Sequence, residues 1–209
     1  MKNKGLLAIL GLGFVLVLII SLMAGYYLNE LNGEAIANGN VISKEVSAKE
    51  FDGMVLNGVA DVNIHSSESY KVVVTTDSNI QDNIAITVDN NILRIDTEYN
   101  NFFWHNPPKV TIDIYTPELK NVELNGVGDI KILNGKSSDL KIKLSGVGDI
   151  DARNYEVENV NITLHGTGDI KVWATDTLTG KFSGVGDVLY KGDPLINIDT
   201  NGIGRVKRL

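Results

Sequence analysis

Alternation of apolar and polar residues, interrupted by pairs of glycines, dominates the second half of the chain. Around the first interruption, Val122-Glu-Leu124 and Ile130-Lys-Ile132 place an apolar residue at every second position. A period of two is that of a half-buried strand and not of an amphipathic helix. The glycines between these two segments allow a sharp backbone bend. Each unit therefore predicts a strand, a corner and a second strand.

The corner, Gly-x-Gly-Asp followed by Ile or Val, recurs at regular spacing. Its first glycines lie 20, 20, 18 and 18 residues apart, a period typical of proteins built from stacked repeats. A degenerate copy at 56–62 has Ala60 in place of the second glycine, so we expect the stack to begin there. The predicted structural repeat corners comprise Gly126, Gly128, Asp129, Gly146, Gly148, Asp149, Gly166, Gly168, Asp169, Gly184, Gly186, Asp187, Gly202, Gly204 and Arg205.

Stacking of these units predicts a parallel β-helix, or β-solenoid. Val122, Ile142 and Ile162 would lie above one another inside, at about 4.8 Å per coil. Glu123 and Lys143 would be neighbours outside, where opposite charges support the register.

The segment between the first copy and residue 121 predicts further strands without a clear repeat. Candidates lie at 62–64, 71–75, 84–88, 92–96 and 110–115. Asp89-Asn-Asn91 separates two of them and predicts a hairpin turn. No segment after residue 28 shows a convincing period of 3.6 residues, so we expect this part of the chain to be almost entirely β.

The amino-terminal segment has a different character. An uncharged, mostly apolar run spans residues 5–28, and the roughly 20 residues needed to cross a bilayer fit within it. We interpret residues 1–28 as a cytoplasmic tip with one transmembrane helix, 29–49 as a polar linker and 50–209 as the β-helix domain. A removed signal peptide is the alternative, but its apolar region is usually only about 7–15 residues long. Lys2 and Lys4 precede the run, which predicts a single-pass protein of the cell membrane whose carboxy-terminal domain is periplasmic or extracellular.

Composition restricts the partners of this domain. The chain has 209 residues, no cysteine and a formal net charge of −7; because the two early lysines contribute +2, the remainder carries −9. This charge argues against nucleic acid and against adsorption to anionic lipid.

Several segments together resemble a known family. Phe51-Asp-Gly-Met-Val-Leu56, Asn91-Ile-Leu-Arg-Ile95, Val110-Thr-Ile-Asp-Ile114 and Leu119-Lys-Asn-Val122, followed by the Gly-x-Gly-Asp corners, are similar to the bacterial auto-transporter adhesin head GIN domain over about residues 46–206. The resemblance implies a right-handed parallel β-helix and a location outside the cytoplasm. It implies no established activity. The predicted fold class is therefore all-β, a parallel β-helix outside the membrane with one N-terminal transmembrane helix.

The corner aspartates form the first candidate site. Stacked carboxylates repel one another, and two alternatives offset this: hydrogen bonds from backbone N–H groups at each corner, or Ca²⁺ shared between coils. We favour the first and predict neither a metal site nor a cofactor. We expect Arg205 to act as an electrostatic cap over Asp187. The Ca²⁺ alternative would use Asp129, Asp149, Asp169 and Asp187.

A second candidate is an aromatic segment beside two prolines. It would either bind a partner or cover the open end of the stack, and its residues are Phe102, Phe103, Trp104 and His105. No nucleophile motif or clustered acid–base pair is present, so we expect a binding, adhesion or scaffold module of the envelope with a protein or glycan ligand, and no catalytic residues. A glycan-active enzyme using the corner aspartates, or a sensory or assembly partner in envelope stress, remain alternatives. Uncovered edges at the end of the stack also leave homo-oligomerisation open.

Overall fold

The computed structural model describes residues 21, 23, 37–97 and 108–209. Within the last two ranges nearly all regular structure is strand, and the one helical element there is the short 3-10 helix η1, Gln81–Asn83. The first strands are β1 Val41–Ser47, β2 Gly53–Asn57, β3 Asp61–Ser66, β4 Lys71–Asp77, β5 Ile84–Asp89, β6 Ile92–Thr97 and β7 Thr111–Thr116. The later strands are β8 Asn121–Leu124, β9 Ile130–Ile132, β10 Lys136–Leu144, β11 Ile150–Leu164, β12 Ile170–Phe182, β13 Val188–Lys191, β14 Leu195–Thr200 and β15 Val206–Arg208.

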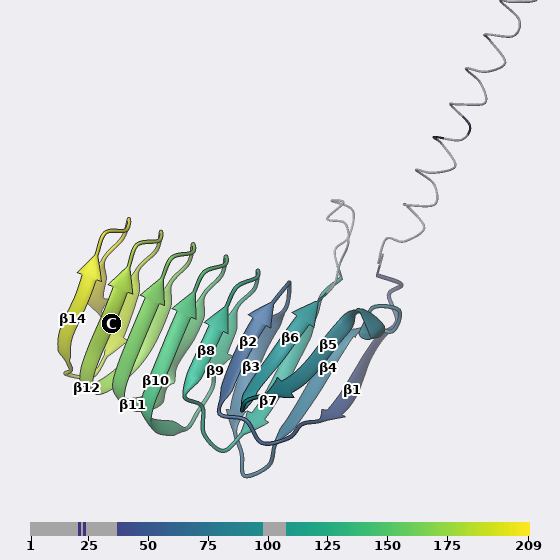
Figure 1. Cartoon of the computed structure of the whole chain (residues 1–209), viewed down its shortest axis with the longest axis horizontal. Coiled ribbons are helices and arrows are strands. Elements are labelled where there is room, and N and C mark those ends of the chain that lie inside the picture. The colour runs from purple at the N-terminus through teal and green to yellow at the C-terminus, as the bar shows by residue number, and fades with distance from the viewer. Residues whose placement is uncertain (1–20, 22, 24–36, 98–107) are drawn as a thin grey trace, which may run out of the picture.

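Strands β8 to β15 form the part that we call the repeat stack, residues 121–208. Its strands pair in parallel between successive coils, at offsets of 20 or 18 residues except for a short irregular stretch between β11 and β12. Val122 pairs with Ile142 and Ile142 with Ile162, as predicted. Figure 1 shows the resulting coils side by side, with the corners along their upper edge.

On the outward-facing surface of the repeat stack, the predicted charge pairing between neighbouring coils is also present. Lys143 Nζ lies 2.6 Å from Glu123 Oε1, and both side chains are partly exposed. An ion pair of this kind stabilises the fold by at most about 1 kcal/mol. It supports the register and does not create it.

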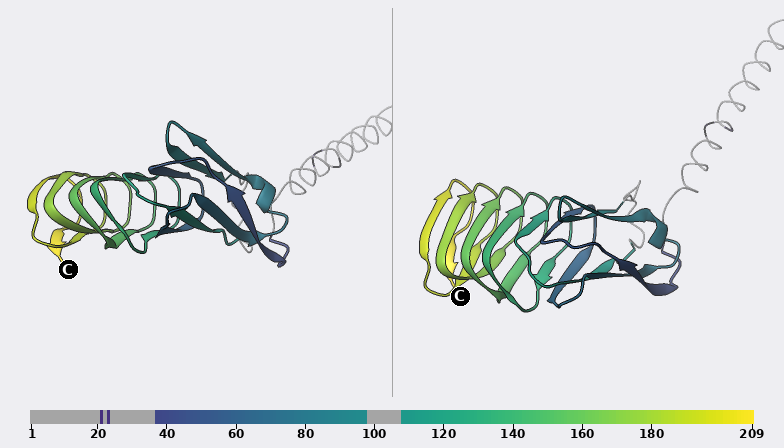
Figure 2. Two further views of the ribbon diagram at one scale, coloured as in Figure 1. Left: turned by 90° about the horizontal axis from the view of Figure 1, so that it is seen from below. Right: turned by 60° about the horizontal axis from the view of Figure 1, so that its bottom comes forward.

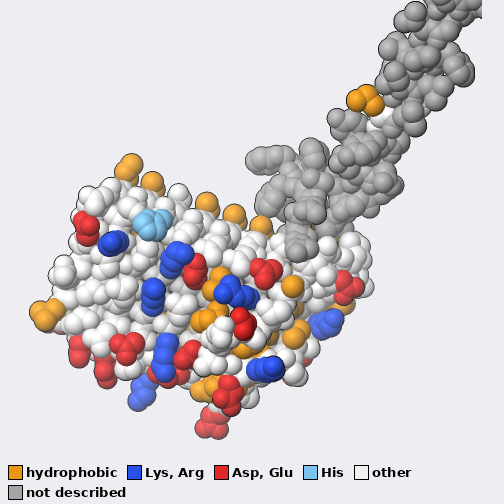
Figure 3. Space-filling model, in the orientation of Figure 1, with side chains coloured by type: hydrophobic (Ala, Val, Ile, Leu, Met, Phe, Trp, Pro, Cys, Tyr) orange, Lys and Arg blue, Asp and Glu red, His pale blue; other side chains and the backbone are white. Residues whose placement is uncertain are grey.

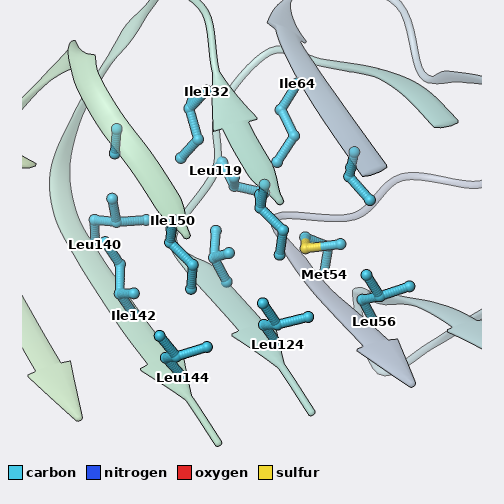
Figure 4. Close-up of a cluster of buried hydrophobic side chains, with 14 of the residues drawn as sticks. Met54, Leu56, Ile64, Leu119, Leu124, Ile132, Leu140, Ile142, Leu144 and Ile150 are labelled. Atoms are coloured by element: carbon cyan, nitrogen blue, oxygen red, sulfur yellow. The ribbon is translucent and has the colours of Figure 1, made fainter. Parts of the chain in front are cut away.

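The core lies between the two walls of these coils. Every second side chain points inward, because successive residues of a strand face opposite sides of the sheet. Leu56, Leu124 and Leu144 form one column and are fully buried (Figure 4). In the last complete coil, Phe182 occupies the same column, paired with Leu164. Its larger ring fills space above the final corner.

The strands before residue 121 are arranged differently. β2 and β3 stack directly on β8 and β9 in parallel, but β6 and β7, later in the chain, lie on their other side. The chain therefore builds a coil, then adds strands beyond it, and returns past it to begin the repeat stack.

Antiparallel pairing completes this end of the molecule. β4 pairs antiparallel with both β7 and β1, and β5 pairs antiparallel with β6. Asn90 and Asn91 connect β5 to β6 with φ of 48° and 62°, the left-handed region that a tight hairpin turn requires. The hairpin predicted at Asp89-Asn-Asn91 is thus confirmed. β1 lies within the segment 29–49, for which the sequence predicts a polar linker.

The fold class predicted from sequence, a parallel β-helix with one N-terminal transmembrane helix, is wrong. The fifteen strands of the described residues belong to one mixed sheet that curls into a nearly closed, barrel-like form around a single core, seen from two further sides in Figure 2. The prediction was based on the repeats, and the antiparallel strands contain no such repeat that would have indicated their pairing. No helix in the described part of the chain is long and apolar enough to span a bilayer. Except for Ser21 and Met23, the apolar run 5–28 lies outside the described residues.

Candidate functional site: the stacked corners

The corners stack because glycine leaves room for the next backbone. A Cβ at Gly146 would collide with the carbonyl oxygen of Gly126, and a Cβ at Gly148 with that of Gly128. Gly148 also has a φ of 139°, a backbone conformation that residues with a side chain rarely adopt. The same obstruction recurs at every predicted corner glycine. Glycine is therefore required here by the contact between coils as well as by the bend.

The residue between the two glycines continues the ladder through the corner. Val127 N–H donates to the carbonyl of Gly58 at 2.7 Å, and Val147 N–H to that of Gly126 at 2.9 Å. The side chains of these residues point outward. Four of them expose 44–74% of their surface. We name this row the corner ridge; it comprises Val59, Val127, Val147, Thr167, Val185 and Ile203.

In Figure 3, hydrophobic side chains are spaced along the upper edge of the molecule, where Figure 1 places the corners. Six residues at about 4.8 Å per coil give a row about 24 Å long. Isolated exposed aliphatic residues are ordinary on protein surfaces, whereas a contiguous apolar surface marks interaction sites. Sequence reasoning missed this ridge. Its signal was present, because five of its six members are β-branched aliphatic residues and the sixth is threonine.

A polar column runs beside the ridge, two residues earlier in each corner. Asn125 Nδ2 donates to Asn57 Oδ1 at 3.0 Å, and His165 Nδ1 is hydrogen-bonded to Ser183 Oγ. The members of this polar column are Asn57, Asn125, Ser145, His165, Ser183 and Asn201, and all except the partly buried Asn57 are exposed. Amide, hydroxyl and imidazole groups thus line one flank of the apolar ridge.

On the other flank, the predicted aspartates form a ladder of hydrogen bonds. The N–H of Asp149 donates to Asp129 Oδ1 at 3.0 Å, and the N–H of Asp169 donates to Asp149 Oδ1 at 2.8 Å. The Asp ladder comprises Asp61, Asp129, Asp149, Asp169 and Asp187, and ends at the N–H of Arg205. The carboxylates do accept hydrogen bonds from backbone N–H groups, but each donor belongs to the next coil and not to the aspartate's own corner.

Lysines neutralise part of this ladder. Lys171 Nζ lies 3.3 Å from Asp149 Oδ2, and Lys207 Nζ lies 2.9 Å from Asp187 Oδ2. Hydrogen bonding from Lys207, followed by the backbone N–H of Arg205, lowers the pKa of Asp187. The ion pair at this end comes from Lys207; the closest contact from Arg205 is its backbone N–H at 2.9 Å. Among the described residues no cluster of three or more His, Asp or Glu is arranged to hold a metal ion.

The aromatic segment predicted as a possible partner-binding site cannot be placed, so that prediction stays untested. Phe102, Phe103, Trp104 and His105 lie outside the described residues. His65 Nε2 lies 3.2 Å from Asp113 Oδ1 and its ring stacks on Tyr115 with centroids 4.6 Å apart. A shallow polar hollow of about 190 Å³ lies on the outer face of the sheet, lined by Asp61, Asn63, Lys109, Thr111, Asp129 and Lys131.

Comparison with known proteins assigns the family. The family model described as "Putative auto-transporter adhesin, head GIN domain" matches residues 50–132 and 121–194. A crystal structure of a putative adhesin from Bacteroides fragilis is 24% identical, with a TM-score of 0.55, over 81% of this chain and 97% of that chain. A putative lipid binding protein from Parabacteroides distasonis is 20% identical, with a TM-score of 0.42, over 84% and 99%.

A putative cell adhesion protein from Clostridium sporogenes is 19% identical, with a TM-score of 0.45, over 81% and 98%. No curated protein matches. The Bacteroides fragilis structure shares the fold of this chain, and the family match covers well over half of the chain. The chain therefore belongs to the auto-transporter adhesin head GIN domain family.

Proposed function

We propose that this chain is a non-catalytic binding module of the cell envelope that holds an extended, neutral polysaccharide along its stacked corners, outside the cytoplasm. The observation that carries the proposal is the corner ridge with the polar column beside it. Adhesin names in the family and among its members support a binding role in general. The ligand class is argued below from the surface itself.

The corner surface combines the two kinds of group that a sugar polymer needs. Val147 and Val185, exposed to 52% and 46%, offer apolar contact to the C–H faces of sugar rings. Asn125 and Ser145, two residues before a ridge position, offer hydrogen bonds to hydroxyl groups. Because every coil presents the same pair of columns, the surface suits a ligand that is itself a linear repeat.

Other linear polymers fit this surface less well. An extended polypeptide places same-side residues about 6.6–6.8 Å apart, so it would not keep register with coils about 4.8 Å apart. The net charge of −7 opposes nucleic acid and anionic polysaccharides. A neutral polysaccharide avoids the charge conflict.

The carboxylates at the corners favour binding over hydrolysis. A glycosidase needs one carboxylic acid and one carboxylate placed on either side of the scissile bond. In the described Asp ladder, Oδ1 of each aspartate already accepts a backbone N–H of the next coil. These carboxylates therefore hold neighbouring coils together. Their regular spacing along one column places no two of them on opposite sides of a bound ligand.

Affinity electrophoresis of the purified full-length chain tests the proposal. Native gels would contain amylose, dextran, mannan or a soluble β-glucan, and retarded migration in at least one of them is the expected result. Val127→Lys combined with Val147→Lys should weaken retention at least about tenfold, since it places charge in the apolar contact.

The matched control is Leu133→Lys, because Leu133 is 40% exposed but does not belong to the ridge. Normal migration of the unmodified chain in every gel would refute the proposal. Equal retention of the ridge variant and the Leu133 variant would remove the ridge as the site. Release of reducing ends from the polysaccharide that is bound would instead favour the glycan-active enzyme.

A further inference from the structure

The polar hollow on the outer face of the sheet lies where the repeat stack meets the earlier strands. Asp61 and Asn63 of β3 line it together with Thr111 of β7 and Lys131 of β9, and β7 and β9 are the two strands that pair with β3. Lys109, just before β7, adds a second ammonium group. Because β9 belongs to the repeat stack and β7 does not, the hollow marks the junction between the two regions.

Further along the stack, lysines neutralise aspartates of the preceding coil. Lys171 Nζ lies 3.3 Å from Asp149 Oδ2, and Lys207 Nζ lies 2.9 Å from Asp187 Oδ2. Lys131 stands in the same column as these two lysines, since the pairing of β9, β11, β12, β13 and β15 brings their positions into register. An ion pair between Lys131 and the aspartate of the coil before it is therefore expected.

At the hollow this ion pair does not form. The aspartate of the preceding coil is Asp61, and among the described residues neither Lys131 nor Lys109 forms an ion pair with any carboxylate. The Oδ1 atoms of Asp61 and Asp129 accept backbone N–H groups of the next coil at 3.2 Å and 3.0 Å, and in the same part of the chain their Oδ2 atoms have no hydrogen-bond partner. Two ammonium groups and two carboxylates thus line one hollow without pairing with each other.

The charges of the hollow select the class of ligand. A simple anion would lie beside two carboxylates and a simple cation beside two ammonium groups, so each would meet repulsion as well as attraction. A molecule with both charges can pair with both kinds of group. The volume of about 190 Å³ is smaller than the roughly 300–1,000 Å³ of sites for drug-sized ligands, which restricts the ligand to a few heavy atoms.

We propose that this hollow binds a small zwitterion, a molecule with an ammonium group and a carboxylate a few bonds apart, as in an amino acid. The ammonium group of the ligand pairs with Asp61 and Asp129. Its carboxylate pairs with Lys109 and Lys131, and the Asn63 side chain supplies a further hydrogen-bonding group. This inference goes beyond the polysaccharide proposed for the corner ridge and does not depend on it.

Amide chemical-shift titration of the full-length chain in mild detergent tests the site by NMR. Glycine and γ-aminobutyrate are the probes, because they hold the two charges at different separations. The Asp129 N–H donates to Asp61 Oδ1 and reports from the hollow, whereas the Asp187 N–H, further along the Asp ladder, is the internal reference. At least one probe should shift the Asp129 signal saturably and leave the Asp187 signal unchanged. A dissociation constant of about 1–10 mM is expected, because exposed ion pairs are individually weak.

Acetate and methylammonium compare the zwitterion with its two halves. Each carries only one of the two charges and meets a like charge in the hollow, so at equal ionic strength each should bind at least about tenfold more weakly than the better zwitterion. Binding of acetate or methylammonium as tight as that of the zwitterions would overturn the ligand class and identify a site for a simple ion.

Substitutions locate the site. Lys131→Gln and Asp61→Asn should each weaken binding of the better probe at least about fivefold, since each removes one charged partner. Lys171→Gln is the matched control, because Lys171 lies in the same column but its ammonium group already pairs with Asp149. Its affinity should change by less than about twofold. Far-UV circular dichroism melts establish that each variant is folded.

Two results would overturn the inference. One is the absence of a saturable shift at Asp129 with either probe up to about 50 mM, and the other is an equal loss of affinity in the Lys131 and Lys171 variants. Migration of the same variants in the polysaccharide gels reports separately on the proposed function, because neither lysine belongs to the corner ridge or the polar column.

Discussion

The repeat stack and the strands before residue 121 differ in how each strand pairs with its neighbours. Among the described strands of the repeat stack, pairing between successive coils is parallel and has an offset of 20 or 18 residues, apart from an irregularity where Glu156 and Val157 pair with Trp173 and Ala174. Before residue 121, β6 and β7 lie beyond β2 and β3, and β1, β4 and β5 pair antiparallel. The same parallel pairing therefore continues from coil to coil in the repeat stack, and it stops in the strands before residue 121.

The difference teaches what a stacked sheet requires at its ends. A coil inside the stack has a neighbour on each side, so its backbone groups and core residues are covered. At the N-terminal end, Phe51 and Ile80 are buried and antiparallel strands cover the core, although β1 and β5 each pair with only one described strand. At the other end, Ile196 and Leu195 are exposed at 44% and 79%. Covering the core at one end of the sheet therefore required strands whose sequence departs from the repeat.

The largest expected effect comes from breaking the register of the repeat stack at a corner. In Gly148→Ala the new Cβ meets the Gly128 carbonyl, and the backbone keeps a φ of 139°. Overpacking and backbone strain together should lower the free energy of unfolding by about 3–5 kcal/mol. Urea denaturation followed by circular dichroism measures this loss.

Gly39→Ala provides the control for that experiment. Gly39 also has a positive φ, 77°, but nothing lies within 4 Å of its Cβ position. It should therefore lose only about 1 kcal/mol, from strain alone. Equal losses at the two glycines would show that backbone conformation, and not the contact between coils, makes glycine necessary at the corner.

A smaller effect is expected where the two regions are joined. Tyr155 of β11 is 2% exposed, and its hydroxyl accepts the Leu119 N–H at 2.9 Å and donates to the Leu119 carbonyl at 3.1 Å. Burial raises the pKa of Tyr155, which keeps the hydroxyl protonated. Tyr155→Phe would leave both backbone groups of buried Leu119 unpaired, at a cost of about 1–3 kcal/mol in unfolding free energy.

The same denaturation measurement applies to this variant, with Tyr190→Phe as its control. Tyr190 is only half-buried, so its variant should change stability by less than about 0.5 kcal/mol. Identical values for the two variants would mean that the hydroxyl of Tyr155 does not hold the connection between β7 and β8.

The sequence predicted how its repeats pair, although the fold class inferred from them was wrong. Alternation and glycine spacing placed Val122, Ile142 and Ile162 in one column, and Asp89-Asn-Asn91 predicted the hairpin; both are observed. The alternation of β4 identifies its buried face but not its neighbour or its direction. The placement of β6 and β7 beyond β2 and β3 depends on pairing between distant segments, which no local pattern records.

The candidate site was predicted to a similar extent. The corner aspartates were expected to accept backbone N–H groups, and they do. Their donors lie on the next coil, because the stacked corners bring Asp149 N–H within 3.0 Å of Asp129 Oδ1. The corner ridge was missed, since the outward direction of Val127 and Val147 follows from the corner geometry and not from the strand period.

The smallest expected effect concerns the last step of the Asp ladder, and its sign depends on pH. Hydrogen bonding from Lys207, then from the Arg205 N–H, lowers the pKa of Asp187 in the folded chain. The stability that Asp187 contributes is therefore fully present above its unfolded pKa, about 3.9, and is lost as the pH falls through the lower folded value. Asp187→Asn keeps an acceptor for the Arg205 N–H but removes the charge. It should be less stable than the wild type at pH 7, and the difference should shrink below about pH 4.

A double-variant cycle with Lys207→Gln separates the two partners of this carboxylate. Coupling between Asp187 and Lys207, taken from urea denaturation at pH 7 and pH 3, should be favourable at pH 7 and weaker at pH 3. Coupling that does not change with pH would mean that the 2.9 Å contact between Lys207 Nζ and Asp187 Oδ2 contributes no charge interaction.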